Sequence, residues 1–140
     1  MELRLPAISI NEAVARSIIS AFVAELDPTV EELGDLRCAV SEAVTNYIVH
    51  AYKGRLSDDP GDIYISVKLY DTREITVEIT DRGCGIEDTE QARRPRFTTG
   101  EYGERCGMGF LVMESFTDYL SVKSELGHGT QILMRKKLKP

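Results

Sequence analysis

No run of apolar residues in this sequence reaches the roughly eighteen that a membrane-spanning helix requires. The N-terminus also lacks a basic region followed by a hydrophobic core, the pattern that marks a secretory signal. These two absences predict a cytoplasmic protein without a membrane segment.

Residues that form disulfides or bind zinc are scarce. The three cysteines, Cys38, Cys84 and Cys106, include no C-x-x-C pair, and an odd number does not make a disulfide framework. Only two histidines are present, which disfavours a Cys/His zinc site. The phosphate-binding P-loop and the Rossmann fingerprint are missing too, which argues against both of those nucleotide-binding classes.

The composition is that of an ordinary globular protein, with 42% hydrophobic and 29% charged residues, and 140 residues suffice for one domain with its own core. The net charge of -6 argues against direct binding to nucleic acid or to an anionic membrane. A nucleotide site remains open, because backbone amides and one or two basic residues can hold phosphates on an acidic protein.

The hydrophobic pattern predicts the order β-α-α-β-β-loop-α-β-β. Strands are expected at residues 2–8, 63–70, 75–81, 119–124 and 130–135, and helices at 10–26, about 30–52 and 107–116. This order predicts an α+β fold, a two-layer sandwich with a largely antiparallel sheet covered on one face by helices. Residues 82–105 show hardly any periodicity, and long irregular segments of this kind are usually functional or mobile.

The first helix has start signals and an apolar face. Pro6 lacks an N–H, so it is expected on an edge strand or at a strand end. Ser9 and Glu12 match a capping box, in which each side chain accepts a backbone N–H of the other. The apolar face is expected to comprise Val14, Ile18, Phe22 and Leu26, with Ala21 beside them.

The second helix carries two parallel stripes. Its apolar residues recur every three or four positions, at Leu33, Leu36, Val40, Val44 and Ile48. Beside them Glu42, Asn46 and His50 are spaced four apart, so a carboxylate and a carboxamide can reach one ligand or one metal ion. The alternative is that these polar residues only face solvent.

Glycines gather in three segments. Asp81-Arg82-Gly83-Cys84-Gly85 directly follows a strand, and its glycines would let the backbone approach a flat ligand. Gly107-Met108-Gly109 opens a helix, where free N–H groups make an anion site. Gly127-His128-Gly129-Thr130 precedes the last strand. Singly, each segment could be an ordinary turn.

Together these motifs resemble the GHKL ATPases and kinases. Their order and separations match across nearly the whole chain: Glu42-x-x-x-Asn46, Asp81-x-Gly83-x-Gly85, Gly107-x-Gly109 and Gly129-Thr130. The resemblance implies the Bergerat type of α+β sandwich. Within the superfamily, the sequences of residues 41–46, 97–99, 104–110 and 113–116 are similar to those of the anti-sigma F factor family. The general-stress anti-sigma kinases are the nearest relatives that could be confused with it.

The resemblance implies that ATP and Mg²⁺ are bound. Asp81 would accept a hydrogen bond from the adenine amino group, Gly83 and Gly85 would leave space under the base, and Thr130 would support the same edge. A buried acceptor that is left unpaired costs about 1–3 kcal/mol, enough to select ATP over GTP by roughly tenfold to a hundredfold.

At the other end of the nucleotide, the resemblance implies that Asn46 is a ligand of Mg²⁺ and that Glu42 takes the proton from an attacking serine hydroxyl. A lid over the triphosphate is implied at about residues 94–109. Its phosphate contacts would come from Thr98, Thr99, Gly107, Met108 and Gly109. Arg105 would stabilise charge on the transferred phosphoryl group, the alternative being a solvated lid residue.

Two residues depart from the family pattern. Gly100 stands where the lid often carries Lys, which removes one possible phosphate contact. Tyr47 follows Asn46 where a small residue is usual, so the edge of the pocket is expected to be tighter.

The resemblance also implies partners. The chain would form a homodimer, bind a sporulation sigma factor so that RNA polymerase cannot use it, and phosphorylate an anti-anti-sigma protein on serine, which inactivates that partner. Arg16, on the first helix, would contact partners, although it could equally be a solvated charge. The alternatives are a general-stress anti-sigma kinase and a nucleotide-gated sigma-binding module without kinase activity. The catalytic half of a histidine kinase is disfavoured by the missing phospho-acceptor helices.

Overall fold

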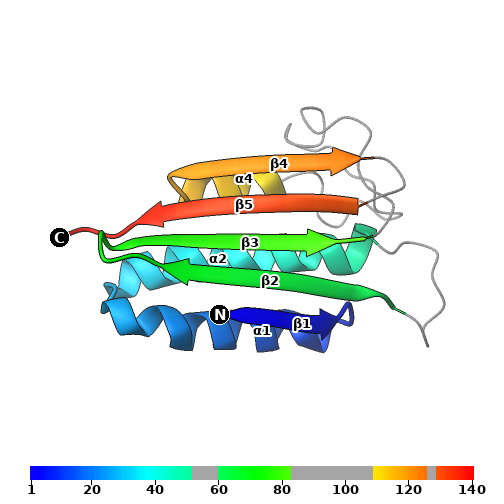
Figure 1. The fold of residues 1–140 in the computed structure, drawn as a ribbon, viewed down its shortest axis with the longest axis horizontal. Coiled ribbons are helices and arrows are strands. Elements are labelled where there is room, and N and C mark those ends of the chain that lie inside the picture. Colours follow the sequence, from blue (N-terminus) through cyan, green and yellow to red (C-terminus); the bar gives the residue numbers. More distant parts are fainter. Residues whose placement is uncertain (52–59, 83–108, 126–128) are drawn as a thin grey trace.

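The computed structural model describes residues 1–51, 60–82, 109–125 and 129–140. Five antiparallel strands form one sheet in the order β1-β2-β3-β5-β4. The strands are β1 (Glu2–Pro6), β2 (Asp62–Leu69), β3 (Glu74–Asp81), β4 (Tyr119–Glu125) and β5 (Gly129–Lys137). The helices α1 (Ile10–Val23), α2 (Val30–Asn46) and α4 (Gly109–Phe116) all lie on one face of the sheet, as Figure 1 shows. The expected two-layer α+β architecture is confirmed.

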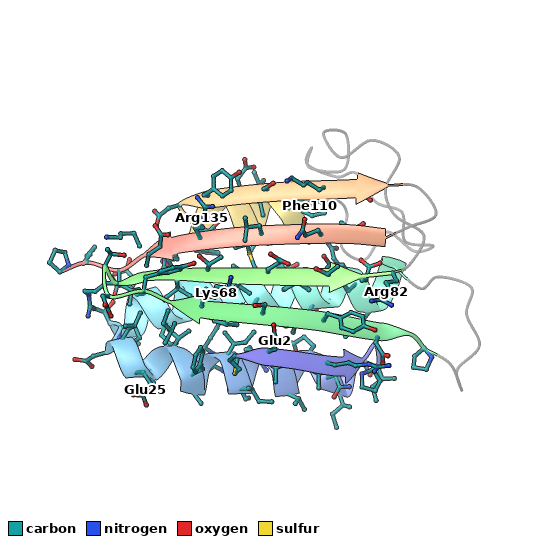
Figure 2. All side chains as sticks on the ribbon, viewed as in Figure 1. Glu2, Glu25, Lys68, Arg82, Phe110 and Arg135 are labelled. Atoms are coloured by element: carbon teal, nitrogen blue, oxygen red, sulfur yellow. The ribbon has the colours of Figure 1, made fainter. Side chains whose placement is uncertain are left out.

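Strict alternation places the core between sheet and helices. Buried residues alternate with more exposed ones in β2 and β3, and the buried apolar side chains are Ile63, Ile65, Val67, Ile75, Val77 and Ile79. The residues between them face away from the helices; Figure 2 labels Glu2, Lys68 and Arg135 on this outer face, and all three are exposed. Pro6 ends the edge strand β1, as its missing N–H predicts.

Two expectations for α1 are wrong. Ser9 makes no side-chain cap because its own backbone is already helical (φ -57, ψ -35), whereas a capping side chain needs an extended residue. Glu12 instead lies 3.6 Å from Arg16. The fully buried face is shifted by one position, to Asn11, Ala15, Ile19 and Val23, and Ala21 is exposed. Of the predicted face, Phe22 and Leu26 are partly buried and pack against the core. The helix ends at Val23 and continues as a 3-10 turn, Ala24–Leu26.

The capping box occurs instead at the start of α2. Thr29 is extended (φ -67, ψ 162), its hydroxyl accepts the Glu32 N–H at 3.1 Å, and Glu32 accepts the Thr29 N–H at 2.9 Å. The other carboxylate oxygen of Glu32 accepts the Lys139 N–H at 2.7 Å, which fastens the C-terminal residues to α2. The expected apolar stripe is confirmed at Leu36, Val40 and Val44, which are buried.

The regular helix ends at Asn46. Residues Tyr47–Ala51 continue it as a π-helix, in which backbone hydrogen bonds span one residue more than in an α-helix. The expected helix therefore extends to residue 51 within the described residues, but its last turn is wider than predicted. Among the described residues, no helix combines the length and the apolar character that a membrane span needs.

We expect Glu32→Gln to lower the unfolding temperature at neutral pH, because it removes the charge that accepts two backbone amides. The Lys139 and Thr29 N–H groups lower the pKa of this carboxyl. Its stabilising effect is therefore present above the ordinary glutamate pKa and is lost as the pH falls through the folded-state pKa. Thermal unfolding followed by circular dichroism should show a wild-type to mutant difference that shrinks as the buffer becomes acidic.

The control is Glu31→Gln, which removes the same charge one residue earlier in the first turn of α2, where the side chain is exposed. It is expected to change the unfolding temperature little at any pH. Equal effects from the two variants would mean that helix-dipole electrostatics, rather than the Lys139 and Thr29 contacts, explains the stabilisation.

Candidate functional site

Buried polar residues single out one end of the sheet. Among the described residues, Asn11, Glu32, Asp81 and Thr130 are polar and buried. Asn11 and Glu32 have structural explanations, since Asn11 donates to the Pro6 carbonyl at 2.8 Å and Glu32 caps α2. Asp81 and Thr130 lie together instead, at the end of β3 and the start of β5.

The Asp81 carboxylate is only 2% exposed, and one of its oxygens accepts the Thr130 N–H at 3.3 Å. A buried carboxylate is costly unless donors face it, and the Thr130 N–H is one such donor. A carboxylate can accept several hydrogen bonds, so Asp81 could also accept one from a ligand. Arg82, the next residue, faces the opposite side of the sheet, where its guanidinium lies 5.2 Å from the Tyr64 ring centre. Figure 2 labels Arg82 at this end of β3.

Gly129 makes this arrangement possible. Its backbone has φ +107, and a Cβ here would overlap the Asp81 carbonyl oxygen and lie 2.9 Å from the Arg82 Cα. No other residue fits such a close approach of two strands. Ser124 of β4 contacts the same part of β5, since its hydroxyl donates to the Gly129 carbonyl at 3.0 Å and lies 2.9 Å from the Thr130 hydroxyl.

The second half of the site lies where α2 packs against α4. A Cβ on Gly109, the first residue of α4, would lie 3.2 and 3.3 Å from the two polar atoms of the Asn46 carboxamide. The carboxamide therefore rests directly on the Gly109 backbone. Asn46 and Glu42 are both partly buried and lie one turn apart on α2. The arrangement allows an oxygen of Asn46 to meet a metal ion, because Mg²⁺ keeps several waters and needs few protein ligands.

Tyr47 joins the two halves, a role that the sequence alone did not indicate. Its side chain is 3% exposed, and its hydroxyl donates to the Ile79 carbonyl at 2.5 Å and lies 3.2 Å from the Thr130 carbonyl. The sequence did hold a signal for this role, because Tyr47 lies next to the apolar stripe of α2. A tyrosine in that position buries its ring, and its buried hydroxyl then needs a hydrogen-bond partner.

The structure thus brings Asp81 near Thr130 and Asn46 near Gly109, whereas Arg16 lies on α1. In Figure 1 α1 and α4 are at opposite edges of the helical layer. The remaining predicted site residues lie outside the described residues, and these are Gly83, Gly85, Thr98, Thr99, Arg105, Gly107 and Met108.

Comparison with known proteins identifies the family of the chain. The family model for the histidine kinase-like ATPase domain matches residues 5–136. The chain is 47% identical to an anti-sigma F factor of Clostridium acetobutylicum over 137 residues, which cover 98% of this chain and 92% of that protein. It is also 49% identical to the anti-sigma F factor of Caldanaerobacter subterraneus, over 97% of this chain and 92% of that protein. The anti-sigma F factor of Pasteuria penetrans is 49% identical as well, over 99% of this chain and 90% of that protein.

The chain belongs to the anti-sigma F factor family. Membership in a family of histidine kinase-like ATPase domains implies that the chain binds a nucleotide.

Solved structures support the fold. The RsbU and RsbW domains of Rv1364c from Mycobacterium tuberculosis superpose with a TM-score of 0.69 at 19% identity, over 99% of this chain and 31% of that one. The histidine kinase domain from Erythrobacter litoralis EL346 superposes with a TM-score of 0.61 at 18% identity. The match covers 91% of this chain and 61% of that one. This chain therefore spans about a third of the mycobacterial chain. The GHKL-type fold expected from the motifs is confirmed for this anti-sigma F factor family member.

We expect Gly129→Ala to destabilise the fold by at least about 2 kcal/mol, because the residue would have to adopt a positive φ and push Asp81 away. Urea denaturation measures the change. Gly34→Ala is the matched control, since nothing lies within 4 Å of a Cβ at that position of α2. It is expected to stabilise by roughly 0.5–1 kcal/mol. A neutral Gly129→Ala would contradict the close approach of β3 and β5.

Proposed function

We propose that the chain is an anti-sigma factor that keeps a sigma factor from RNA polymerase and is also a Mg-ATP-dependent serine kinase of an anti-anti-sigma protein. The observation that carries the proposal is the buried Asp81 carboxylate beside Thr130. An adenine amino group is a suitable donor for this acceptor, whereas the guanine carbonyl would be repelled by it. Gly83 and Gly85 would leave room under the base.

The phosphate end of the nucleotide is assigned to α2 and the lid. Asn46 would hold Mg²⁺, which supplies positive charge to the phosphates when it is bound. The amides of Gly107, Met108 and Gly109 would face phosphate oxygens, with the hydroxyls of Thr98 and Thr99 nearby. Arg105 would stabilise the charge that builds on the transferred group.

Glu42 is proposed as the general base. It lies one turn before Asn46 on α2 and is partly buried, so its carboxylate is held on the same side of the helix as the proposed metal ligand. It would accept the proton of the substrate serine hydroxyl as the oxygen attacks the terminal phosphorus.

Partner binding is assigned to α1. The Arg16 side chain is 35% exposed, and its Nε lies 3.6 Å from Glu12 Oε1. The exposed part of the side chain would contact a partner. In Figure 1 α1 lies at the other edge of the helical layer from α4. The sigma factor would therefore bind at α1 without covering the nucleotide, whereas the substrate serine must reach the phosphate end. We further propose that the protein is a homodimer, as the family resemblance implies, and that it acts in the cytoplasm.

We expect Glu42→Gln to keep ATP binding but to reduce phosphoryl transfer by about 10²-fold or more, since Gln cannot take up the serine proton. Labelled ATP, Mg²⁺ and the anti-anti-sigma protein encoded with this chain would be incubated, and label on serine quantified. The control Glu31→Gln lies on the same helix and should transfer normally. Normal transfer by Glu42→Gln would remove Glu42 as the base. If wild type binds ATP and sigma but transfers nothing, the chain is a nucleotide-gated sigma-binding module.

We expect Asp81→Asn to weaken ATP binding by roughly tenfold to a hundredfold, because a neutral amide is a poorer acceptor for the adenine amino group. Isothermal titration calorimetry with Mg²⁺ measures the affinity. Asp118→Asn is a close control, since the Asp118 carboxylate also accepts a backbone N–H of β5, that of Lys137 at 2.6 Å, but is exposed. Equal affinities of wild type and Asp81→Asn would rule out Asp81 as the adenine acceptor.

A further inference from the structure

Tyr47 carries a polar group that packing alone does not require. Its ring is buried in the core and a phenylalanine would occupy the same space, yet the hydroxyl is placed among backbone groups rather than apolar side chains. Burying a hydroxyl is unfavourable unless it is hydrogen-bonded, so its contacts decide what this residue contributes.

Those contacts lie at one particular place in the sheet. The pairing of β3 with β5 ends at Thr80 and Gln131, just before Asp81 and Thr130. The hydroxyl donates to Ile79 at 2.5 Å and lies 3.2 Å from the Thr130 carbonyl, so it bridges both strands where their own ladder stops. Thr130 is thereby held on two sides, because its N–H is donated to Asp81.

An independent observation concerns the helix. Tyr47 is the first residue of the π-helical segment, directly after Asn46. π-helical turns are rare and frequently mark functional sites. Since successive helical side chains point about 100° apart, Tyr47 can reach the sheet while Asn46 rests on Gly109 of α4.

We propose that Tyr47 is a positioning residue for the nucleotide: its hydroxyl sets the distance between the helix that carries Asn46 and the strand ends that carry Asp81 and Thr130. The inference rests on the proposed function, because it assigns a base and a metal ion to these two places. One bound nucleotide must meet both ends at once, so their spacing determines affinity and the choice of base together.

The test is Tyr47→Phe, which removes only the hydroxyl. Calorimetry would be carried out with Mg-ATP and Mg-GTP at a temperature where circular dichroism shows both proteins folded. We expect ATP affinity to fall about three- to tenfold, as for the loss of one buried hydrogen bond. The ratio of ATP to GTP affinity is expected to fall as well, because Asp81 and Thr130 are no longer held against the helix.

Tyr119→Phe is the matched control, since Tyr119 is 47% exposed on β4 and its ring lies beside the Arg135 guanidinium. It should leave both affinities unchanged. A merely structural role for Tyr47 would lower the unfolding temperature while the ATP to GTP ratio stays at its wild-type value, and that result would overturn the inference.

The outcomes separate this inference from the function on which it rests. Absence of ATP binding by wild type would overturn the proposed function itself. Wild-type binding with an unchanged Tyr47→Phe would overturn only the role of Tyr47. If Tyr47→Phe does not fold, Tyr47→Met tests the same loss with a side chain that fills irregular space. Failure of both to fold would also overturn a positioning role, since the hydroxyl would then be required by the fold.

Discussion

The close approach of β3 and β5 at one end of the sheet determines the geometry of the candidate site. Gly129 permits it, because its positive φ and missing side chain let the β5 backbone pass against the Asp81 carbonyl. At this separation the Thr130 N–H reaches the Asp81 carboxylate at 3.3 Å. A side chain at 129 would separate the strands, and the acceptor proposed for the base would lose its backbone donor.

The contacts that join distant parts of the chain and the candidate site lie at opposite ends of the sheet. At the end that carries the β2–β3 turn, Arg73 donates to the carbonyls of Leu26 and Lys139, and Glu32 accepts the Lys139 amide, so helix, hairpin and C-terminal residues are joined there. At the opposite end, β3 ends with Asp81 beside the start of β5; Figure 1 shows these two strand ends next to each other. Polar groups satisfy one another at the first end, and at the second the buried Asp81 carboxylate accepts the Thr130 N–H. The second end is the one that we propose for nucleotide binding.

Much of the fold could be predicted because strands alternate strictly. The two halves of the β2–β3 hairpin, the antiparallel sheet and the apolar stripe of α2 follow from local patterns. The face of α1 did not, because two neighbouring apolar stripes compete: Val14 and Ile18 form one, and Ala15 and Ile19 the other. Only the packing of α1 against its neighbours selects between them. Likewise, Ser9 and Thr29 both begin a capping-box pattern, and the backbone conformation of each decides which one forms.

What the sequence by itself determined is the set of residue types and their spacing: a Glu and an Asn one helical turn apart, an Asp that ends a strand, and a glycine before the last strand. These are local properties, set by helical and strand periodicity. The tertiary structure alone decided that Asn46 rests on Gly109, that Asp81 meets Thr130, and that the Tyr47 hydroxyl reaches two strands. Such contacts join residues far apart in the chain, so they depend on strand register, helix placement and single backbone angles that no local pattern encodes.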